Sequence, residues 1–203
     1  MASRLPKFGT AIVDPPWPYM RTSSSDKLTG YSDKQYESLS IADLSSLPVG
    51  EVTSNVLLLW TTAPMMIDAL NLVADWGFDY ITQLYWVKSS DEPERIGNRV
   101  TTFRPSYGVG YWFRGNCEPI IVAKKKRSPS WRTNLPSTFY AKRLGHSRKP
   151  DFLHEVAEAF FPGPYLELFA RTRRDGWSQL GDELEGDGRD IRQSLSIMEE
   201  RRG

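Results

Sequence analysis

With 203 residues, of which 39% are apolar, the chain has the length of one globular domain and needs no disulfide or metal to hold its core. Its single cysteine, Cys117, excludes an intramolecular disulfide, its apolar runs are too short to span a membrane, and MASRLPKFG lacks the apolar stretch of a signal peptide. The net charge is only +1, and we expect a soluble, cytoplasmic protein with one domain at 1–184 and a polar tail, helical or disordered, at 185–203.

The first predicted element is a short buried strand at Thr10–Val13, which ends at Asp14. Pro15 and Pro16 follow at once. Because neither proline has a backbone N–H to donate, they cannot extend a helix or a central strand. Ligands of open α/β sheets bind beyond the carboxyl ends of the strands, so the segment after this strand is predicted to line a binding site.

Two strands and a helix are predicted next. Residues 55–61 (NVLLLWT) form a second buried strand, and a helix with Pro64 in its first turn runs to Gly77, a residue suited to the position after a helix. Residues 80–88 (YITQLYWVK) are rich in β-branched and aromatic side chains, which favours a third strand. The apolar residues of 89–116 show no regular spacing, and a long irregular segment of this kind is typical of a lid or a binding loop.

The remaining elements continue the alternation. Residues 118–124 (EPIIVAK) form a fourth strand, a helix over 151–161 begins after Pro150, and residues 165–171 (YLELFAR) form a fifth strand. Strands that alternate with helices predict an α/β fold with a mostly parallel, doubly wound sheet and helices on both faces.

The segment DPPW at 14–17 suits a reaction at the exocyclic amine of a nucleobase. Such a nitrogen is a poor nucleophile because its lone pair is delocalised into the ring. The Asp14 carboxylate and the Pro15 carbonyl can hold both amine hydrogens and draw the nitrogen toward tetrahedral geometry, while the prolines fix the backbone at low entropic cost. Trp17 offers a flat face on which the base can stack. The expected catalytic residues are Asp14, Pro15, Pro16 and Trp17.

Positive charge is concentrated in residues 121–149, which hold nine Lys or Arg and no Asp or Glu, with Trp131, Phe139 and Tyr140 among them. This mixture is typical of a surface that contacts phosphates and stacks on bases, although a solvated loop has the same composition. The expected nucleic-acid-binding residues are Lys88, Lys124, Lys125, Lys126, Arg127, Trp131, Arg132, Lys142, Arg143 and Arg148.

An ordered set of blocks resembles the adenine-N6 methyltransferases of the MT-A70 family. The blocks are DPPW at 14–17, LWTT at 59–62, DWGF at 75–78, WVK at 86–88, GYW at 110–112 followed by Glu118, HSRKPD at 146–151, ELFAR at 167–171, and GW at 176–177 followed by Gly181. They cover residues 8–184, and the chain resembles a small bacterial or phage-like member.

The resemblance implies a class I methyltransferase fold, Rossmann-like and permuted so that the catalytic strand precedes the cofactor strand. It also implies S-adenosylmethionine as cofactor. By position, Lys149 matches a lysine that contacts the carboxylate end of the cofactor, and residues 181–183 match a segment that reaches its ribose and adenine. Larger members of the family often carry Asn-Gln where this chain has Asp182 and Glu183. The implied cofactor-binding residues are Asp14, Lys149, Glu167, Phe169, Arg171, Gly181, Asp182 and Glu183.

Several other reactive side chains have plainer interpretations. Lys88 and Glu118, at strand ends, suit either a site role or a structural ion pair. His154 is expected to be structural because it lies within a helix, and Cys117 is expected to be a small buried residue. The two histidines, His146 and His154, have no cysteine near them in the sequence, so no metal site is predicted.

The predicted function is therefore methylation of N6 of adenine in nucleic acid, with DNA favoured over RNA. The alternatives are an RNA methyltransferase, a non-catalytic nucleic-acid-binding subunit of a methyltransferase complex, and an enzyme that methylates a small-molecule or protein amine. We expect nucleic acid as a partner and no membrane association. A homodimer or a second methyltransferase-like subunit would supply further recognition surface.

Overall fold

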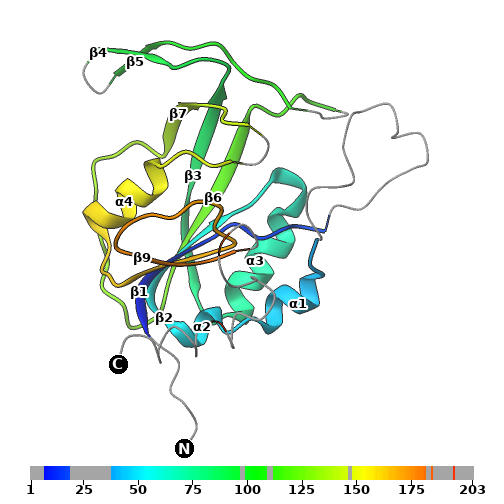
Figure 1. Ribbon diagram of the computed structural model, residues 1–203, viewed down its shortest axis with the longest axis vertical. Coiled ribbons are helices and arrows are strands. Elements are labelled where there is room, and N and C mark those ends of the chain that lie inside the picture. The colour runs from blue at the N-terminus through cyan, green and yellow to red at the C-terminus, as the bar shows by residue number, and fades with distance from the viewer. Residues whose placement is uncertain are drawn as a thin grey trace, which may run out of the picture.

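The computed structural model describes residues 7–18, 38–96, 99–108, 112–145 and 148–181, together with Leu184 and Ser194. Its centre is a seven-stranded sheet in the order β7-β3-β6-β2-β1-β8-β9 (Figure 1). The strands are β1 (Phe8–Val13), β2 (Thr53–Trp60), β3 (Asp79–Ser89), β6 (Cys117–Lys124), β7 (Thr138–Lys142), β8 (Tyr165–Leu168) and β9 (Trp177–Leu180). A separate ribbon pairs β4 (Glu94–Ile96) with β5 (Arg99–Thr102).

The large sheet is mostly parallel, as predicted, and β6 alone runs against its neighbours. β1 is parallel to β2 and β8, β3 to β7, and β8 to β9, whereas β6 is antiparallel to both β2 and β3. The parallel strands therefore end at one edge of the sheet, after Val13, Trp60 and Ser89, where β6 begins at Cys117. We call this the carboxyl edge. The opposite edge, where β6 ends at Lys124, is called the amino edge.

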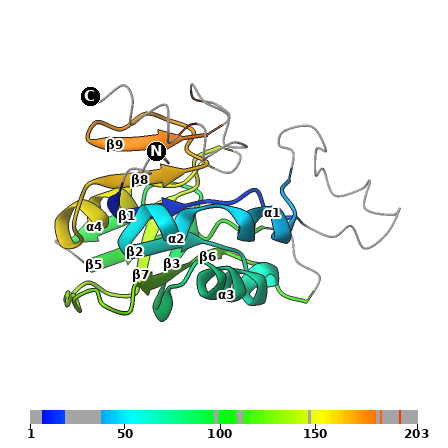
Figure 2. The same ribbon diagram turned by 90° about the horizontal axis from the view of Figure 1, so that it is seen from below.

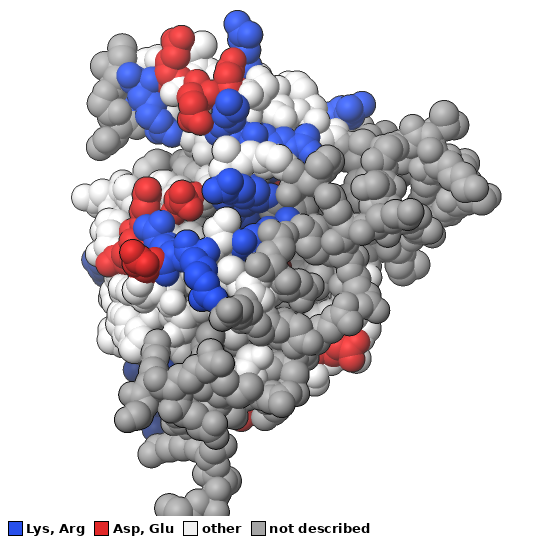
Figure 3. Space-filling model, in the orientation of Figure 1, with Lys and Arg blue, Asp and Glu red and all other residues white. Residues whose placement is uncertain are grey.

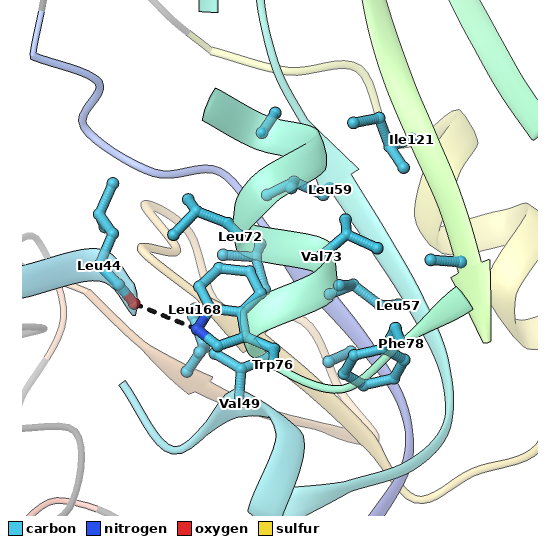
Figure 4. Close-up of a cluster of buried hydrophobic side chains, with 14 of the residues drawn as sticks. Leu44, Val49, Leu57, Leu59, Leu72, Val73, Trp76, Phe78, Ile121 and Leu168 are labelled. Atoms are coloured by element: carbon cyan, nitrogen blue, oxygen red, sulfur yellow. Dashed lines mark hydrogen bonds between the residues drawn. The ribbon is translucent and has the colours of Figure 1, made fainter. Parts of the chain in front are cut away.

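Alternate residues of the central strands face two helical layers, as a doubly wound sheet requires. On one face, Leu57 and Leu59 belong to a cluster with residues of α1 (Ile41–Ser46), α2 (Val49–Val52) and α3 (Met66–Asp75), which are grouped together in Figure 2. Figure 4 shows this cluster, in which Trp76 Nε1 donates to the Leu44 carbonyl at 3.1 Å. On the other face, Leu58 packs with α4 (Phe152–Phe160).

The strands and helices predicted between residues 10 and 171 are all present, with changes at their ends, whereas the predicted tail at 185–203 lies outside the described residues apart from Ser194. The helix after Thr62 opens as a 3-10 turn, η2 (Ala63–Met65), and continues as α3. Gly77 follows α3 with a φ of 73°, the left-handed conformation that glycine adopts without strain. The last predicted strand is shorter than expected, because Phe169 has a φ of 65° and turns the chain out of β8 after Leu168. Arg171 consequently lies in the loop that follows.

Six short elements were not predicted: α1, α2, β4, β5, β7 and β9. The start of α1 carries a capping box, in which the Asp43 N–H donates to Ser40 Oγ at 3.1 Å and the Ser40 N–H donates to Asp43 Oδ2 at 3.3 Å. β7 and β9 are the two outermost strands of the sheet, and strands of four or five residues carry little periodic signal. Within the described part of the chain, no helix is both long and apolar enough to cross a membrane.

Candidate active site

Asp14 lies at the carboxyl edge, one residue beyond β1, and its backbone N–H donates to the Leu168 carbonyl of β8 at 3.4 Å. The two prolines are held by the backbone that follows. The Trp17 N–H donates to the Pro15 carbonyl at 2.9 Å, and the Leu39 N–H donates to the Pro16 carbonyl at 3.1 Å. A carbonyl oxygen has two lone pairs, so the Pro15 oxygen is fixed in direction and still has one acceptor position.

Trp17 is a core residue and not the exposed stacking face that we predicted. Only 6% of it is exposed, and it packs in the cluster that contains Val13 and Leu59. Its Nε1–H donates to the Trp60 carbonyl at 3.3 Å. In this structure Trp17 therefore offers no free ring face to a base, and the structure contradicts the predicted stacking role. What its contacts do is fasten the segment after Asp14 to the end of β2.

Four charged side chains meet at the carboxyl edge and form a chain of alternating sign. Lys149 Nζ lies 2.9 and 2.7 Å from the two carboxylate oxygens of Asp14 and 3.5 Å from Glu118 Oε2. Lys88 Nζ pairs with the other Glu118 oxygen. The Lys88 side chain is 20% exposed, Lys149 18%, and the two carboxylates 17% each, so water screens these charges only in part. Segments far apart in the sequence thus supply one electrostatic unit.

Burial and pairing shift the protonation of this chain. Burial raises the pKa of Asp14, and the ammonium of Lys149 offsets only part of that rise. Burial alone would lower the pKa of Lys149, but the carboxylates of Asp14 and Glu118 outweigh it and raise that pKa. Burial alone would raise the pKa of Glu118, but Lys149 and Lys88 outweigh it and lower that pKa. Glu118 is therefore the firmly ionised carboxylate of the pair, and Asp14 the one that more readily takes a proton.

Of the residues that we expected to bind the cofactor, Glu167, Phe169 and Arg171 lie in β8 or directly after it, and Gly181 directly follows β9. Glu167 Oε2 accepts from Gln179 Nε2 at 2.6 Å and lies 3.0 Å from His154 Nε2, so it has partners on the face covered by α4. Arg171 is close enough to Asp14 and Lys149 to affect the pKa of each. Phe169 marks the sharp turn after β8. Asp182 and Glu183 lie outside the described residues.

Gly181 occupies a place where no larger residue fits. A Cβ atom built there would lie 1.9 Å from the Ala170 carbonyl oxygen and 2.7 Å from its backbone nitrogen. The Ala170 N–H donates to the Leu180 carbonyl at 2.9 Å, which brings the two chain segments together beyond the carboxyl ends of β8 and β9. Gly181 therefore permits this close approach, whatever its contact with a ligand.

Four of the ten predicted nucleic-acid-binding residues lie away from Asp14, at the amino edge. Lys124 is paired with Val56 and Asp79 at the starts of β2 and β3, and Lys125, Lys126 and Arg127 follow it. Two of these lysines have structural partners. Lys124 Nζ donates to the Ser128 carbonyl at 2.8 Å, and Lys125 Nζ donates to the Trp76 carbonyl at 2.7 Å. The structure therefore contradicts a single basic surface over residues 121–149.

Three further residues that we predicted to bind nucleic acid lie elsewhere than expected. Trp131 packs edge-on against Phe161, with 5.7 Å between ring centroids, so it is not a stacking face near Asp14. Trp131 and the next residue, Arg132, both line an apolar pocket that also includes Phe152 and Val156 of α4. Lys88 points to Glu118 and belongs to the charge chain, not to an outward surface.

The other predicted cations do lie at the carboxyl edge. Lys142 ends β7 beside Ser89, and the Arg143 N–H donates to the Ser89 carbonyl at 2.8 Å. Arg148 immediately precedes Lys149 and forms a backbone bridge with Leu144. All three cations are exposed. The sequence could not separate them from the cations at the amino edge, because the intervening segment 128–137 crosses from one edge to the other.

Sequence reasoning missed some features of this edge and misjudged others. The loop between β5 and β6 carries Trp112 and Phe113, which are 93% and 88% exposed. Glu118 was marked by its position at the start of a strand and after the GYW block, but neither signal indicated its place between two lysines. Cys117 is exposed, so our prediction that it is buried was wrong.

Among the described residues, no three His, Cys, Asp or Glu side chains are grouped as metal ligands would be.

Comparison with known proteins gives a consistent result. The family model of MT-A70 matches residues 8–183. The chain is 28% identical over 198 residues to the Type II methyltransferase M.MunI of a Mycoplasma species, covering 88% of this chain and 78% of that protein. It is 28% identical over 187 residues to a putative N(6)-adenosine-methyltransferase MT-A70-like protein of Medicago truncatula, covering 90% of this chain and 27% of that protein. It is also 28% identical over 188 residues to the N(6)-adenosine-methyltransferase subunit METTL3 of Danio rerio, covering 91% and 29%. The chain thus spans less than a third of the two adenosine methyltransferases.

Proposed function

The chain belongs to the MT-A70 family of adenine-N6 methyltransferases, and we propose that it transfers a methyl group from S-adenosylmethionine to N6 of adenine in DNA. The observation that carries this proposal is the Asp14 carboxylate at the carboxyl edge, with the Pro15 carbonyl directly after it and Lys149 on both of its oxygens. The share of the Type II methyltransferase that aligns, 78%, supports DNA over RNA by analogy.

The residues of the edge fit the cofactor by their chemistry. Lys149 and Arg171 are cations that can hold the carboxylate of its amino-acid part, and Asp14 is an anion that suits its positive charges. When bound, S-adenosylmethionine supplies a methyl group attached to a positively charged sulfur. Residues 182–183, which the family resemblance assigns to the ribose and adenine of the cofactor, lie outside the described residues.

Asp14 and Pro15 act on the amine of the target adenine. The ionised Asp14 carboxylate accepts one amine hydrogen and the free lone pair of the Pro15 carbonyl accepts the other, which orients the nitrogen lone pair toward the methyl group. The nitrogen gains one methyl group and loses one proton. Because burial raises the pKa of Asp14, its carboxylate is suited to hold that proton before it passes to water.

Lys149 must release at least part of Asp14 before the amine can bind there. Glu118 is placed to receive it, since Glu118 Oε2 lies only 3.5 Å from Lys149 Nζ. Lys88 in turn keeps Glu118 ionised and in place. We therefore assign Glu118 and Lys88 as positioning residues, which let Lys149 leave the Asp14 oxygens without burying an unpaired ammonium.

The test is a methyl-transfer assay with purified protein, labelled S-adenosylmethionine, and matched single-stranded DNA, double-stranded DNA and RNA. Nucleoside analysis should find N6-methyladenine in DNA. The control is Asp14→Ala, which should lose turnover and keep most of its affinity for S-adenosylmethionine. Methylation of RNA alone would contradict the substrate, and full activity of Asp14→Ala would overturn the mechanism. Absence of transfer to all three nucleic acids, with cofactor bound, would identify a non-catalytic subunit.

A further inference from the structure

We propose that Trp112 and Phe113 form a platform on which unpaired DNA bases beside the target adenine stack. The inference rests on the proposed function and deepens it by naming the part of the chain that holds the strand. The residues concerned lie in the loop between β5 and β6, of which the structure describes 103–108 and 112–116. We call these described residues the aromatic loop.

The exposure of the two rings is unusual. At 93% and 88%, they have the highest exposed fractions among the large apolar side chains that the structure describes. The tryptophans at positions 17, 60, 76, 86 and 177 are all less than a tenth exposed. Two neighbouring aromatic rings in water gain nothing from folding, so their position is explained better by a ligand that covers them.

The aromatic loop is fastened directly to the charge chain at the active site. The Ser106 N–H donates to the Lys88 carbonyl at 2.9 Å, and the Lys88 N–H donates to the Asn116 carbonyl at 2.7 Å. The loop is therefore held at two points, Ser106 and its last residue Asn116, by the residue whose side chain pairs with Glu118. Closer to the two rings, the Gly108 N–H donates to the Gly115 carbonyl at 2.6 Å, which joins the two sides of the loop. The rings thus project from a fixed base beside Asp14's partners.

The charge around the loop selects the partner. From Arg95 to Arg114 the chain has four arginines, at 95, 99, 104 and 114, and no Asp or Glu. The ribbon is seated on β7, because Arg95 Nη2 donates to the Tyr140 carbonyl at 2.6 Å and the Phe103 ring lies 4.7 Å from the Tyr140 ring. Figure 3 shows Lys and Arg over the part of this face where β4, β5 and β7 lie, with Asp and Glu among them, and Arg104 pairs with Asp91 at 3.5 Å. Aromatic rings among cations fit a polyanion that carries flat bases, which is an unpaired nucleic-acid strand.

The chemistry of the reaction requires such a platform. An adenine inside a duplex hides its N6 in the stack, so the base must leave it and its neighbours lose a stacking partner. Aromatic rings placed next to the site can replace that partner, and stacking of this kind accepts any base. The buried Trp17 cannot do this, whereas the aromatic loop carries three exposed rings, of which Trp112 and Phe113 are far more exposed than Tyr107 at 57%.

The test is an equilibrium binding experiment, which needs no turnover. A fluorescent thymine tract with a single adenine is compared with the same strand made abasic on each side of the adenine. The wild type should bind the abasic strand about 5- to 150-fold more weakly, the loss expected for one stacked base. The double variant Trp112→Ala/Phe113→Ala should bind both strands equally, and no better than the wild type binds the abasic one. Tyr80→Ala, which removes a half-exposed ring at the start of β3, should behave as the wild type does.

The outcomes separate this inference from the proposed function. If the double variant still distinguishes the two strands as the wild type does, the platform is refuted, even when the wild type methylates DNA. If the variant loses the distinction while the wild type transfers no methyl group, the platform stands and the catalytic proposal fails. A variant that changes sedimentation behaviour and not strand binding would show that the rings contact a second protein, which also overturns the inference.

Discussion

In the mechanism that we propose, Asp14 and its neighbours determine how the reaction depends on pH. Asp14 accepts amine hydrogens only when it is ionised, so turnover should rise as pH increases through its pKa. Burial raises that pKa, while Lys149 lowers it and the negative charge of Glu118 raises it. The two neighbours therefore act in opposite directions on one titration, which gives two predictions of opposite sign.

Lys149→Met should move the acid limb of kcat/KM for DNA to higher pH. The substitution removes the cation that holds the pKa of Asp14 down, and burial then acts without that opposition. The measurement is kcat/KM for DNA against pH, which reports the pKa of Asp14 before the amine binds, with cofactor at saturation because Lys149 is also proposed to hold the cofactor. Lys126→Gln, at the amino edge, is the control and should keep the wild-type profile. An acid limb that stays in place would show that Asp14 does not control this step.

Glu118→Gln should move the same limb to lower pH and reduce the plateau of kcat. The shift follows because a negative charge near Asp14 is lost. The plateau falls because Lys149 then has no second carboxylate within reach and stays on Asp14. We expect a loss of about 10-fold or more, which equals roughly 1.4 kcal/mol in the barrier. Partial recovery in Glu118→Asp would support the positioning role, whereas a change in KM alone would contradict it.

At the scale of elements, the ends of β8 and β9 depend on Gly181. A Cβ atom at this position would overlap the Ala170 carbonyl oxygen at 1.9 Å, and that atom belongs to the backbone and cannot swing away. Gly181→Ala should therefore lower the free energy of unfolding by about 1–3 kcal/mol, as overpacking does. Urea denaturation measures the change. Gly115→Ala, where a Cβ meets nothing within 4 Å, is the matched control, and equal stability of the two variants would refute the close approach.

The elements that the sequence predicted are those with a strong and regular pattern. β1, β2, β3 and β6 are buried or β-branched runs, and α3 and α4 have apolar positions at helical spacing, so each could be placed to within a few residues. The end of β8 could not be predicted, because the turn depends on the left-handed Phe169, a conformation that its side chain does not favour. β7 could not be predicted because a strand of five residues within the basic segment gives little periodic signal.

The residues of the candidate site also fall into those that the sequence could predict and those that it could not. The DPPW segment and Lys149 could be found because each belongs to a block with a chemical reason of its own. Glu118 and Lys88 could be placed only at strand ends, and their pairing depends on β6 running against its neighbours. Trp17 was misjudged because no pattern in the sequence tells a buried tryptophan from an exposed one. The exposed pair, Trp112 and Phe113, lies in a segment without period.

At the scale of the whole molecule, the charge is divided between the two edges of the sheet. β6 has 8 residues, so its ends are roughly 25 Å apart. The Debye length at physiological ionic strength is about 8 Å, and exposed charges at the amino edge are therefore screened from a strand bound at the carboxyl edge. The cations that are close together in the sequence at 121–149 thus form two separate surfaces in the fold. Of these, the surface with Lys142, Arg143 and Arg148 is the one placed to contact a substrate at Asp14.

Charge removal at the two edges should therefore have different effects on DNA binding. Lys142→Gln/Arg143→Gln removes two exposed cations at the carboxyl edge and should weaken binding and reduce the slope of log K against log salt by roughly 1.4 to 1.8, the value for two lost phosphate contacts. Lys126→Gln/Arg127→Gln removes the same net charge from exposed residues at the amino edge and should leave the slope unchanged. Titration of DNA at several salt concentrations measures both. Equal reductions in the two variants would mean that DNA follows the full length of β6, because total charge is matched and only position differs between them.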